Sequence, residues 1–347
     1  MRATAAGSNL EVRPGTVPQL EGHVLVLTDE DGHQGLGYVH AIPAITTDGA
    51  GARAGLDFLA PFLQGRRVDD LAGIADECDA VLAFAPSVKA GVDMALHDLL
   101  ARRLGVPVHV LLGGKRRDTI AQGRILAIKS PAEMGAQAER LVAEGYGQLK
   151  LKLSGDVDLD VARVAAVRDA AGATTAITLD PNQSYHAKQM MRAFARMETY
   201  DIALIEQPVP AADEAGLALL TRTLPVMVEA DESAQTVRDV FRLVSERKVD
   251  VINLKVTKLG GLQRFLQAVR ICEAGEVGVR VGAAFGPALM QAMSVQAASV
   301  VRHLPAACEL AEHLHLLDDP FTPLPVTQGT IAVPDTPGCG VAFAPSA

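Results

Sequence analysis

The stretch Gly147-Gln148-Leu149-Lys150-Leu151-Lys152-Leu153 alternates leucine with polar residues over most of its length. This period of two is typical of a short β-strand with one apolar face. On the other face Lys150 and Lys152 lie roughly 6–7 Å apart, at a rise of about 3.3 Å per residue. Neighbouring ammonium groups repel each other, which lowers the pKa of each. Taken alone, the pattern favours an edge strand with a solvated basic face, but residues farther along the chain change that interpretation.

Around this stretch, from Thr119 onward, short apolar segments alternate with amphipathic helical patterns. Eight strands in strict alternation with helices favour a closed parallel α/β barrel over an open sheet. The expected strands are Gln122–Ile128, Gly147–Leu153, Ala176–Asp180, Ile202–Glu206, Val226–Ala230, Val249–Leu254, Val277–Gly282 and Ala307–Glu309.

The residues before the barrel have a mixed α+β character. Strand patterns at His23–Thr28 and Gly35–His40 flank a turn and indicate a hairpin, whereas Met1–Leu20 shows no clear first strand. Helices are expected near Ala50–Ala60, Asp69–Phe84 and Ser87–Leu104. In the tail rich in proline and glycine, Thr330–Val333 is expected to return as a strand to the N-terminal domain. We therefore expect an α+β domain over residues 1–115, a barrel over 116–315 and a returning tail over 316–347.

Length and composition limit the classes of function. The chain has 347 residues, enough for a barrel of about 250 residues with a smaller partner domain. Its net charge of −9 argues against a nucleic-acid surface, and no apolar run approaches the roughly 18 residues of a membrane span. Met1–Gly7 lacks the pattern of a signal peptide, and the four scattered cysteines fit a reduced, cytoplasmic protein.

Acidic residues end three successive expected strands of the barrel. Functional groups of such barrels gather at the C-terminal ends of the strands. A single acid there is often a helix cap or a turn residue. Three would converge and repel one another unless a cation lay among them, and oxygen ligands without His or Cys favour Mg²⁺ or Mn²⁺. The predicted ligands are Asp180, Glu206 and Asp231.

Lysines end the strands on either side of these acids. Lys152 ends the second strand and Lys255 the sixth, so in a ring of eight they face each other across the mouth. A carboxylate substrate on the metal would lie between two amines, one on each face of its α-carbon. A desolvated lysine beside other cations can be neutral enough to act as a base, and the metal would stabilise the enediolate. Lys150 would perturb Lys152 and contact the substrate carboxylate.

At these residues the chain resembles the enolase superfamily, and within it the muconate-lactonizing-enzyme subgroup (the mandelate racemase/muconate lactonizing enzyme family). The resemblance implies a modified TIM barrel, (β/α)₇β, with an α+β capping domain, and sites of this superfamily use a Lys or His base together with Mg²⁺. By position, it implies that Lys152 and Lys255 are the acid/base pair, that Lys150 assists and that Asn182 lies beside the metal. The matching motifs are Lys150-Leu151-Lys152, Asp180-Pro181-Asn182, Glu206-Gln207-Pro208, Asp231-Glu232-Ser233, the run from Asn253 to Gly261, and the helix around Val92–Leu99.

The sequence departs from the family pattern in three places. The second strand of the cap has Gly35-Leu36-Gly37-Tyr38 where a Gly-Trp-Gly-Glu-like motif is usual. Met1–Leu20, the region that forms a mobile lid over the substrate in this family, lacks a clear first strand. Dipeptide epimerases place Asp-x-Asp near the eighth strand to hold the substrate ammonium group. This chain has Glu309-Leu310-Ala311, which resembles the cycloisomerases. Glu309 is interpreted either as a substrate contact or acid, or as a structural residue, and Lys258 as structural.

The leading hypothesis is a metal-dependent enzyme that abstracts the α-proton of a small carboxylate and racemises or epimerises an amino acid or a derivative. The alternatives are cycloisomerisation or syn-dehydration at the same site, and a non-catalytic barrel scaffold. We also expect a homo-oligomer that binds neither nucleic acid nor membrane.

Overall fold

The computed structural model describes residues 1–11, 19–43 and 46–345. The N-terminal part forms an antiparallel sheet in the order β1-β2-β3, with helices packed on it. The sequence analysis saw no clear first strand, and this was wrong, because β1 pairs with β2 from Arg2 opposite Thr28 to Glu11 opposite Gln19. Of the segment Met1–Leu20, in which the lid is expected, residues 12–18 lie outside the described residues. The elements of this part are β1 (Arg2–Glu11), β2 (Gln19–Thr28), β3 (Gln34–Ala41), α1 (Gly49–Leu63), α2 (Leu71–Val81), α3 (Pro86–Leu104) and α4 (Val108–Leu111).

Glycines let the long helix α3 lie directly on strand β3. A Cβ at Gly35 would overlap the carbonyl oxygen of Ala95, and a Cβ at Gly37 would overlap that of Gly91. A side chain at either glycine would therefore push the helix off the sheet. The Gly-x-Gly pattern of the hairpin is thus a packing feature of the cap.

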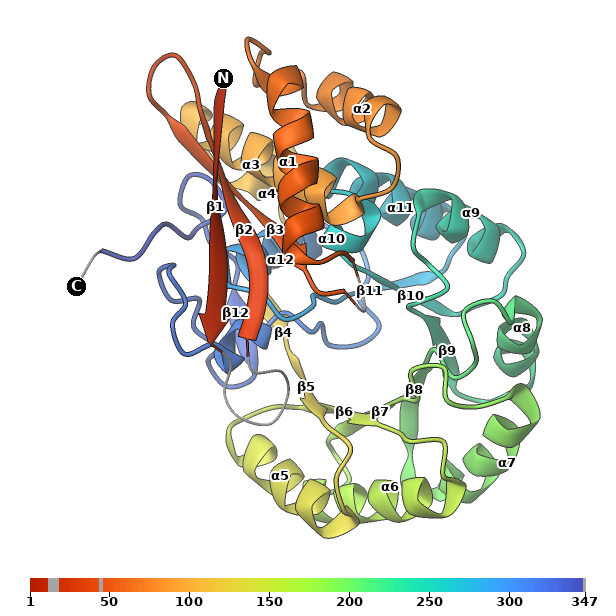
Figure 1. Ribbon diagram of the computed structural model, residues 1–347. Helices are drawn as coiled ribbons and strands as arrows, with labels where there is room; N and C mark the ends of the chain where they lie inside the picture. The colour runs from red at the N-terminus through yellow and green to blue at the C-terminus, as the bar shows by residue number, and fades with distance from the viewer. Residues whose placement is uncertain (12–18, 44–45, 346–347) are drawn as a thin grey trace.

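The second part is a curled parallel sheet with helices around it, in the order β5 to β11 (Figure 1). The first seven predicted strands of the barrel are confirmed, and those at Ala176–Asp180 and Ile202–Glu206 have the predicted bounds. The expected eighth strand consists of bridges only: Gln122 with Cys308, and Gly282 with Glu309. The first bridge joins Cys308 to the residue before β5, and the second joins Glu309 to the residue after β11. Together the two bridges close the barrel.

The strands of the barrel are β5 (Gly123–Leu126), β6 (Gln148–Lys152), β7 (Ala176–Asp180), β8 (Ile202–Glu206), β9 (Met227–Ala230), β10 (Val251–Leu254) and β11 (Gly278–Val281). The helices are α5 (Pro131–Ala143), α6 (Val157–Ala171), α7 (Ala187–Met197), α8 (Glu214–Thr223), α9 (Val237–Ser245), α10 (Val256–Leu259), α11 (Leu262–Ala274) and α12 (Ala288–Ser299), with 3₁₀ turns at Glu198–Tyr200 and Glu312–His315.

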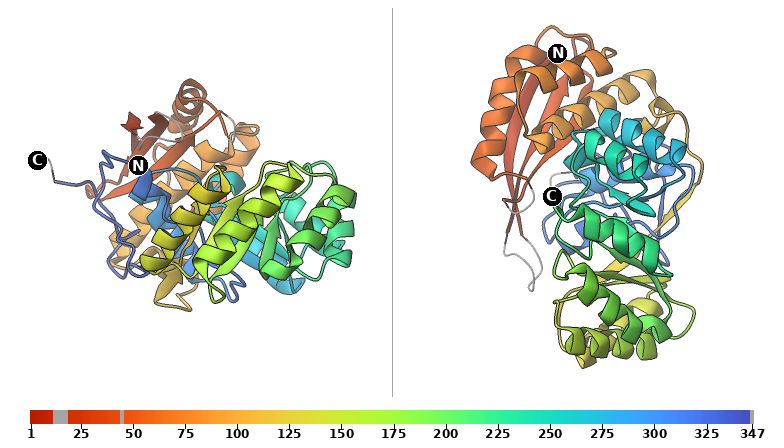
Figure 2. Two further views of the ribbon diagram at one scale, coloured as in Figure 1. Left: turned by 90° about the horizontal axis from the view of Figure 1, so that it is seen from below. Right: turned by 90° about the vertical axis from the view of Figure 1, so that its right-hand side faces the viewer.

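The cap lies against one side of the barrel (Figure 2), where α3 packs on α10 and α11. Leu20 and Ile42 of the cap pack with Phe285, which follows β11, and with Leu316, which follows the eighth strand. The apolar contact places the hairpin beside the barrel mouth. The division of the chain at residues 115 and 315 stays a prediction.

The tail joins both parts of the molecule. Strand β12 (Thr330–Ala332) pairs with β4 (Thr119–Ala121), at the entry to the barrel, rather than with the sheet of the cap as expected. Farther on, the backbone N–H of Cys339 donates to Asp98 of α3 at 2.7 Å. The other oxygen of Asp98 accepts from the backbone N–H of Leu36 at 2.9 Å. A single buried carboxylate thus connects helix, hairpin and tail.

Candidate active site at the barrel mouth

The strand ends bring the predicted residues together. Strand β6 lies between β5 and β7 rather than at an edge, so Lys150 is buried and Lys152 is about a quarter exposed. The three predicted ligands end β7 and β8 and follow β9, and all three are buried. Lys255 follows β10, so the two predicted acid/base lysines lie on strands separated by those of the three acids.

Lys152 is bonded to the end of the neighbouring strand. Its Nζ donates to Oδ2 of Asp180 and to Oδ1 of Asn182, both at 2.5 Å. The amide nitrogen of Asn182 donates in turn to Oε1 of Glu232 at 3.1 Å. Asn182 therefore lies beside the acidic group, where the resemblance placed it.

Two lysines hold the carboxylate of Asp231. Lys255 donates to Oδ2 at 2.5 Å, and Lys258 donates to Oδ1 at 2.7 Å. Burial raises the pKa of Asp231, but the two ammonium groups outweigh burial and hold that pKa well below its usual value. Burial lowers the pKa of Lys255, yet Asp231 and Glu206 raise it above normal. This geometry therefore favours the charged form of Lys255.

Lys150 lies among three carboxylates. Its Nζ is 2.7 Å from Glu309, 2.9 Å from Glu206 and 3.1 Å from Asp180. Burial lowers its pKa, but the carboxylates raise it well above the usual value. The expected lowering by lysine–lysine repulsion is therefore wrong for Lys150, because its partners are acids.

Sequence reasoning missed Arg280 and Glu229, which lie inside the barrel and are fully buried. Arg280 donates to Glu229, to Oε1 of Glu309 at 2.6 Å and to Oε2 of Glu206. Burial raises the pKa of Glu229 to about 8, against the lowering by Arg280. For Glu206, Lys150 and Arg280 outweigh burial and bring the pKa to about 2. A charged residue in the middle of an apolar strand was the only signal for this pair.

Glu309 was considered a substrate contact or an acid. Its Oε1 is engaged by Arg280 and its Oε2 by Lys150, and it is 3% exposed. The position supports the alternative structural role, because both oxygens already face cations.

The donor set fits a hard divalent cation. Asp180, Glu206 and Asp231 each offer carboxylate oxygens, the ligand type that Mg²⁺ prefers. In this structure those carboxylates accept hydrogen bonds from lysines. Two buried oxygens beside the trio, Oε2 of Glu232 and Oδ1 of Asn253, accept no hydrogen bond from a described residue. Among the described residues, however, these three acids do not form a group whose ligand atoms all lie within 4.8 Å of one another.

Among residues 1–11, 19–43 and 46–345, one group of three potential ligands has its ligand atoms within 4.8 Å of one another. That group is Asp29, Asp31 and His33, in the turn between β2 and β3. Oδ1 of Asp29 accepts hydrogen bonds from the backbone N–H groups of Asp31 and His33 in the same turn. The turn therefore has a structural explanation.

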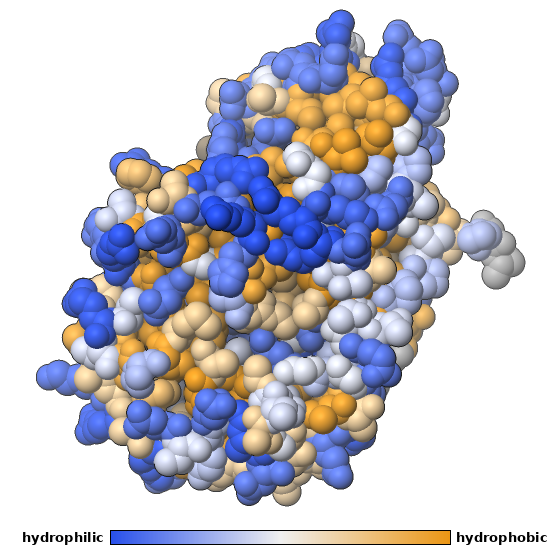
Figure 3. All heavy atoms as spheres, turned by 180° about the vertical axis from the view of Figure 1, so that it is seen from behind, coloured by the Kyte–Doolittle hydropathy of each residue, from blue (hydrophilic) through white to orange (hydrophobic). Residues whose placement is uncertain are grey.

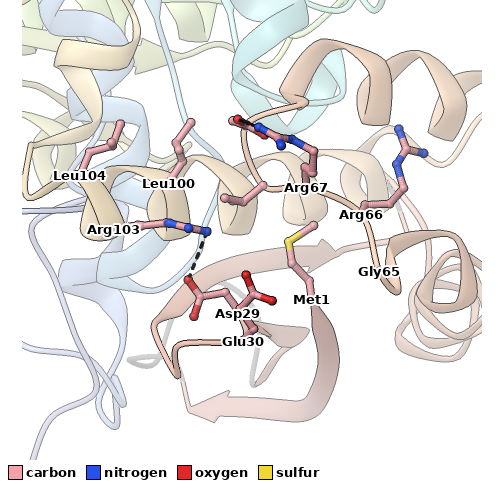
Figure 4. Close-up of a pocket in the computed structure, with 11 residues that line it drawn as sticks. Met1, Asp29, Glu30, Gly65, Arg66, Arg67, Leu100, Arg103 and Leu104 are labelled. Carbon is pink, nitrogen blue, oxygen red and sulfur yellow. Dashed lines mark hydrogen bonds and ion pairs between the residues drawn. The ribbon is translucent and has the colours of Figure 1, made fainter.

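A cavity of about 540 Å³ lies elsewhere, on the cap (Figure 4). Its walls combine Leu100 and Leu104 with arginines, and Arg103 reaches toward Asp29 at 3.9 Å. Seen from behind, the upper part of the molecule also carries an apolar patch above a hydrophilic band (Figure 3). No barrel strand contributes to the cavity, so it is separate from the lysines and carboxylates of the mouth.

Lysines and carboxylates at the C-terminal ends of barrel strands, beside an α+β cap, define a TIM-barrel enzyme with a capping domain. The sequence model described as mandelate racemase/muconate lactonizing enzyme, N-terminal domain, matches residues 8–113. The model described as enolase C-terminal domain-like matches residues 133–347. The chain belongs to this mandelate racemase/muconate lactonizing enzyme family of the enolase superfamily, as the sequence analysis expected.

Relatives in the family carry out different reactions. The chain is 33% identical to muconate cycloisomerase 1 of Rhodococcus opacus, over 82% of this chain and 77% of that protein. It is 31% identical to the L-Ala-D/L-Glu epimerase of Bacillus subtilis, over 94% and 90% of the two chains. The dipeptide epimerase of Enterococcus faecalis, solved with Mg and L-Leu-L-Tyr, has a TM-score of 0.94 and 26% identity, over 98% of this chain and 99% of that one. No helix among the described residues has the length and apolar character needed to cross a membrane.

Proposed function

We propose that the protein abstracts the α-proton of a small carboxylate substrate with one Mg²⁺ or Mn²⁺, and that it racemises or epimerises an amino acid or a derivative. The observation that carries the proposal is the pair Lys152 and Lys255 on β6 and β10, with the acids of β7, β8 and β9 between them. One lysine would take the proton, and the other would return a proton to the opposite face.

In this proposal Asp180, Glu206 and Asp231 hold the metal, which when bound supplies positive charge for the substrate oxygens. The side chains of the protein orient the two lysines. Asn182 and Asp180 orient the ammonium group of Lys152, and Asp231 orients that of Lys255. Hydrogen bonds to residues at the strand ends thus hold both ammonium groups in place. The assembly as a homo-oligomer and the cytoplasmic location stay predictions.

Cycloisomerisation is the second candidate. The muconate cycloisomerase of Rhodococcus opacus is a relative, and Glu309-Leu310-Ala311 resembles that group. The engagement of Glu309 by Lys150 and Arg280 also leaves it without a free oxygen pair for a substrate ammonium group. Only one lysine would be needed as a base in this reaction.

The test is α-proton exchange in D₂O, followed by NMR, with Mg²⁺ and a panel of amino acids, N-acylated amino acids, L-Leu-L-Tyr and cis,cis-muconate. Deuterium at an α-carbon together with loss of optical purity supports racemisation, whereas a lactone product supports the second candidate. Lys255→Ala should abolish racemisation but retain exchange from one enantiomer. Exchange that survives EDTA unchanged contradicts the role of the metal, and full racemisation by Lys255→Ala contradicts the two-base mechanism.

A further inference from the structure

Arg280 is a fully buried cation in a place where barrels are usually filled by branched apolar side chains. A buried charge is costly unless it is paired and hydrogen-bonded. The guanidinium meets this condition with three carboxylates, those of Glu229, Glu206 and Glu309. The pairing uses the planar donor fork that distinguishes arginine from lysine.

These contacts form part of a closed ring. Glu206 and Glu309 each accept from Arg280 on one side and from Lys150 on the other. Negative and positive groups therefore alternate around the ring, which connects β6, β8, β11 and the short eighth strand. Because a guanidinium does not lose its proton in proteins, Arg280 is a permanent member of the ring.

The ring leaves the two oxygens of Glu206 in different situations. Oε2 accepts from both Lys150 and Arg280. Oε1 accepts only a long hydrogen bond, 3.3 Å, from Asn253 among the described residues. One oxygen is anchored, and the other is left to act as a ligand.

We propose that Arg280 is a positioning residue, which anchors Oε2 of Glu206 so that Oε1 can bind the single metal. This inference rests on the proposed function. The guanidinium also engages Oε1 of Glu309, and it thereby keeps Glu309 away from substrate cations.

The test is a titration with Mn²⁺ alone, in which free Mn²⁺ is counted by EPR. We expect one bound ion for the wild type, and an affinity about tenfold weaker for Arg280→Ala, because Glu206 loses one of the two cations that anchor its Oε2. Arg280→Lys should bind Mn²⁺ nearly as tightly as the wild type, since an ammonium group can still donate to Glu206.

The outcomes separate this inference from the proposed function. A wild type that binds no Mn²⁺ contradicts the proposed function. Equal affinities of the wild type and Arg280→Ala for Mn²⁺ contradict the present inference and leave the proposed function standing.

A second variant covers the case in which Arg280→Ala does not fold. Arg280→Met/Glu229→Met removes the ion pair as a unit, and such apolar replacements of buried pairs are often tolerated. It should bind one Mn²⁺ about tenfold more weakly, as is typical when a residue that supports a metal ligand is lost. An unchanged affinity for Mn²⁺ would overturn the positioning role of Arg280.

Discussion

Gly261 lies where the cap meets the barrel, and Gly261→Ala is expected to destabilise the fold strongly. Its φ of +127° is in a region that residues with a side chain rarely adopt, at a cost of about 1–3 kcal/mol. A Cβ there would also lie 2.6 Å from Cβ and Cγ of Asp93 in α3. Asp93 would have to shift, although its carboxylate accepts from the backbone N–H of Leu262, the first residue of α11, at 2.5 Å.

Loss of this bond to a charged group adds about 1.5–3 kcal/mol. The total of roughly 2.5–6 kcal/mol is a large part of the roughly 5–15 kcal/mol that stabilises a typical protein.

Two other glycines provide matched controls for this prediction. Gly260 also has a positive φ, +93°, but the nearest atom to its Cβ would be the carbonyl oxygen of Pro86 at 4.0 Å. Gly260→Ala should therefore show the backbone cost alone, about 1–3 kcal/mol. A Cβ at Gly147 would meet nothing within 4 Å, so Gly147→Ala should change the free energy of unfolding by less than about 1 kcal/mol. Urea denaturation of the three variants measures these differences, and equal losses for Gly261→Ala and Gly260→Ala would refute the reasoning.

Further predictions concern the metal, the junction and the pH dependence of stability. Lys258→Met should weaken Mn²⁺ binding about 10–100-fold, measured by EPR titration, because Asp231 loses one of the two lysines that orient it. Mg²⁺ at about 100 times its dissociation constant should stabilise the folded protein by about 2.7 kcal/mol in thermal denaturation, and Asp231→Asn should lose this effect. Burial lowers the pKa of His97, but Asp93 outweighs burial and raises it. The stabilisation by this pair should be complete below about pH 6.5 and lost as the pH rises through the raised pKa. The difference in free energy of unfolding between the wild type and His97→Gln should thus shrink as the pH rises above about 6.5, and a difference that grows with rising pH would contradict the assignment.

The barrel and its strand ends were predictable because their signals are local. Each strand is a short apolar run, and an acid or a lysine follows it at the point where the helix pattern begins. The periodicity alone located β7 and β8 with their correct bounds. The order of the motifs along the chain was then sufficient to predict the family.

The missed features depend on partners that are distant in sequence. Strand β1 is composed largely of small and polar residues, and only its pairing with β2 identifies it as a strand. Arg280 and Glu229 are 51 positions apart, and their buried charges are explained only by the ion pair between them. The pKa of Lys150 was predicted from its neighbour Lys152, whereas the structure surrounds it with acids from three other strands of the barrel.

The aspartate that connects helix, hairpin and tail has a consequence for biosynthesis. Asp98 is made early, but the backbone N–H of Cys339 that it accepts lies 241 residues later in the chain. Domains generally fold during synthesis from the N-terminal end, at about 5–20 residues per second. For at least about 12 seconds at the faster rate, Asp98 therefore lacks its hydrogen-bond partner from the tail. A nascent chain released before Cys339 emerges would carry an incomplete cap, so completion of the first domain requires the segment around Cys339.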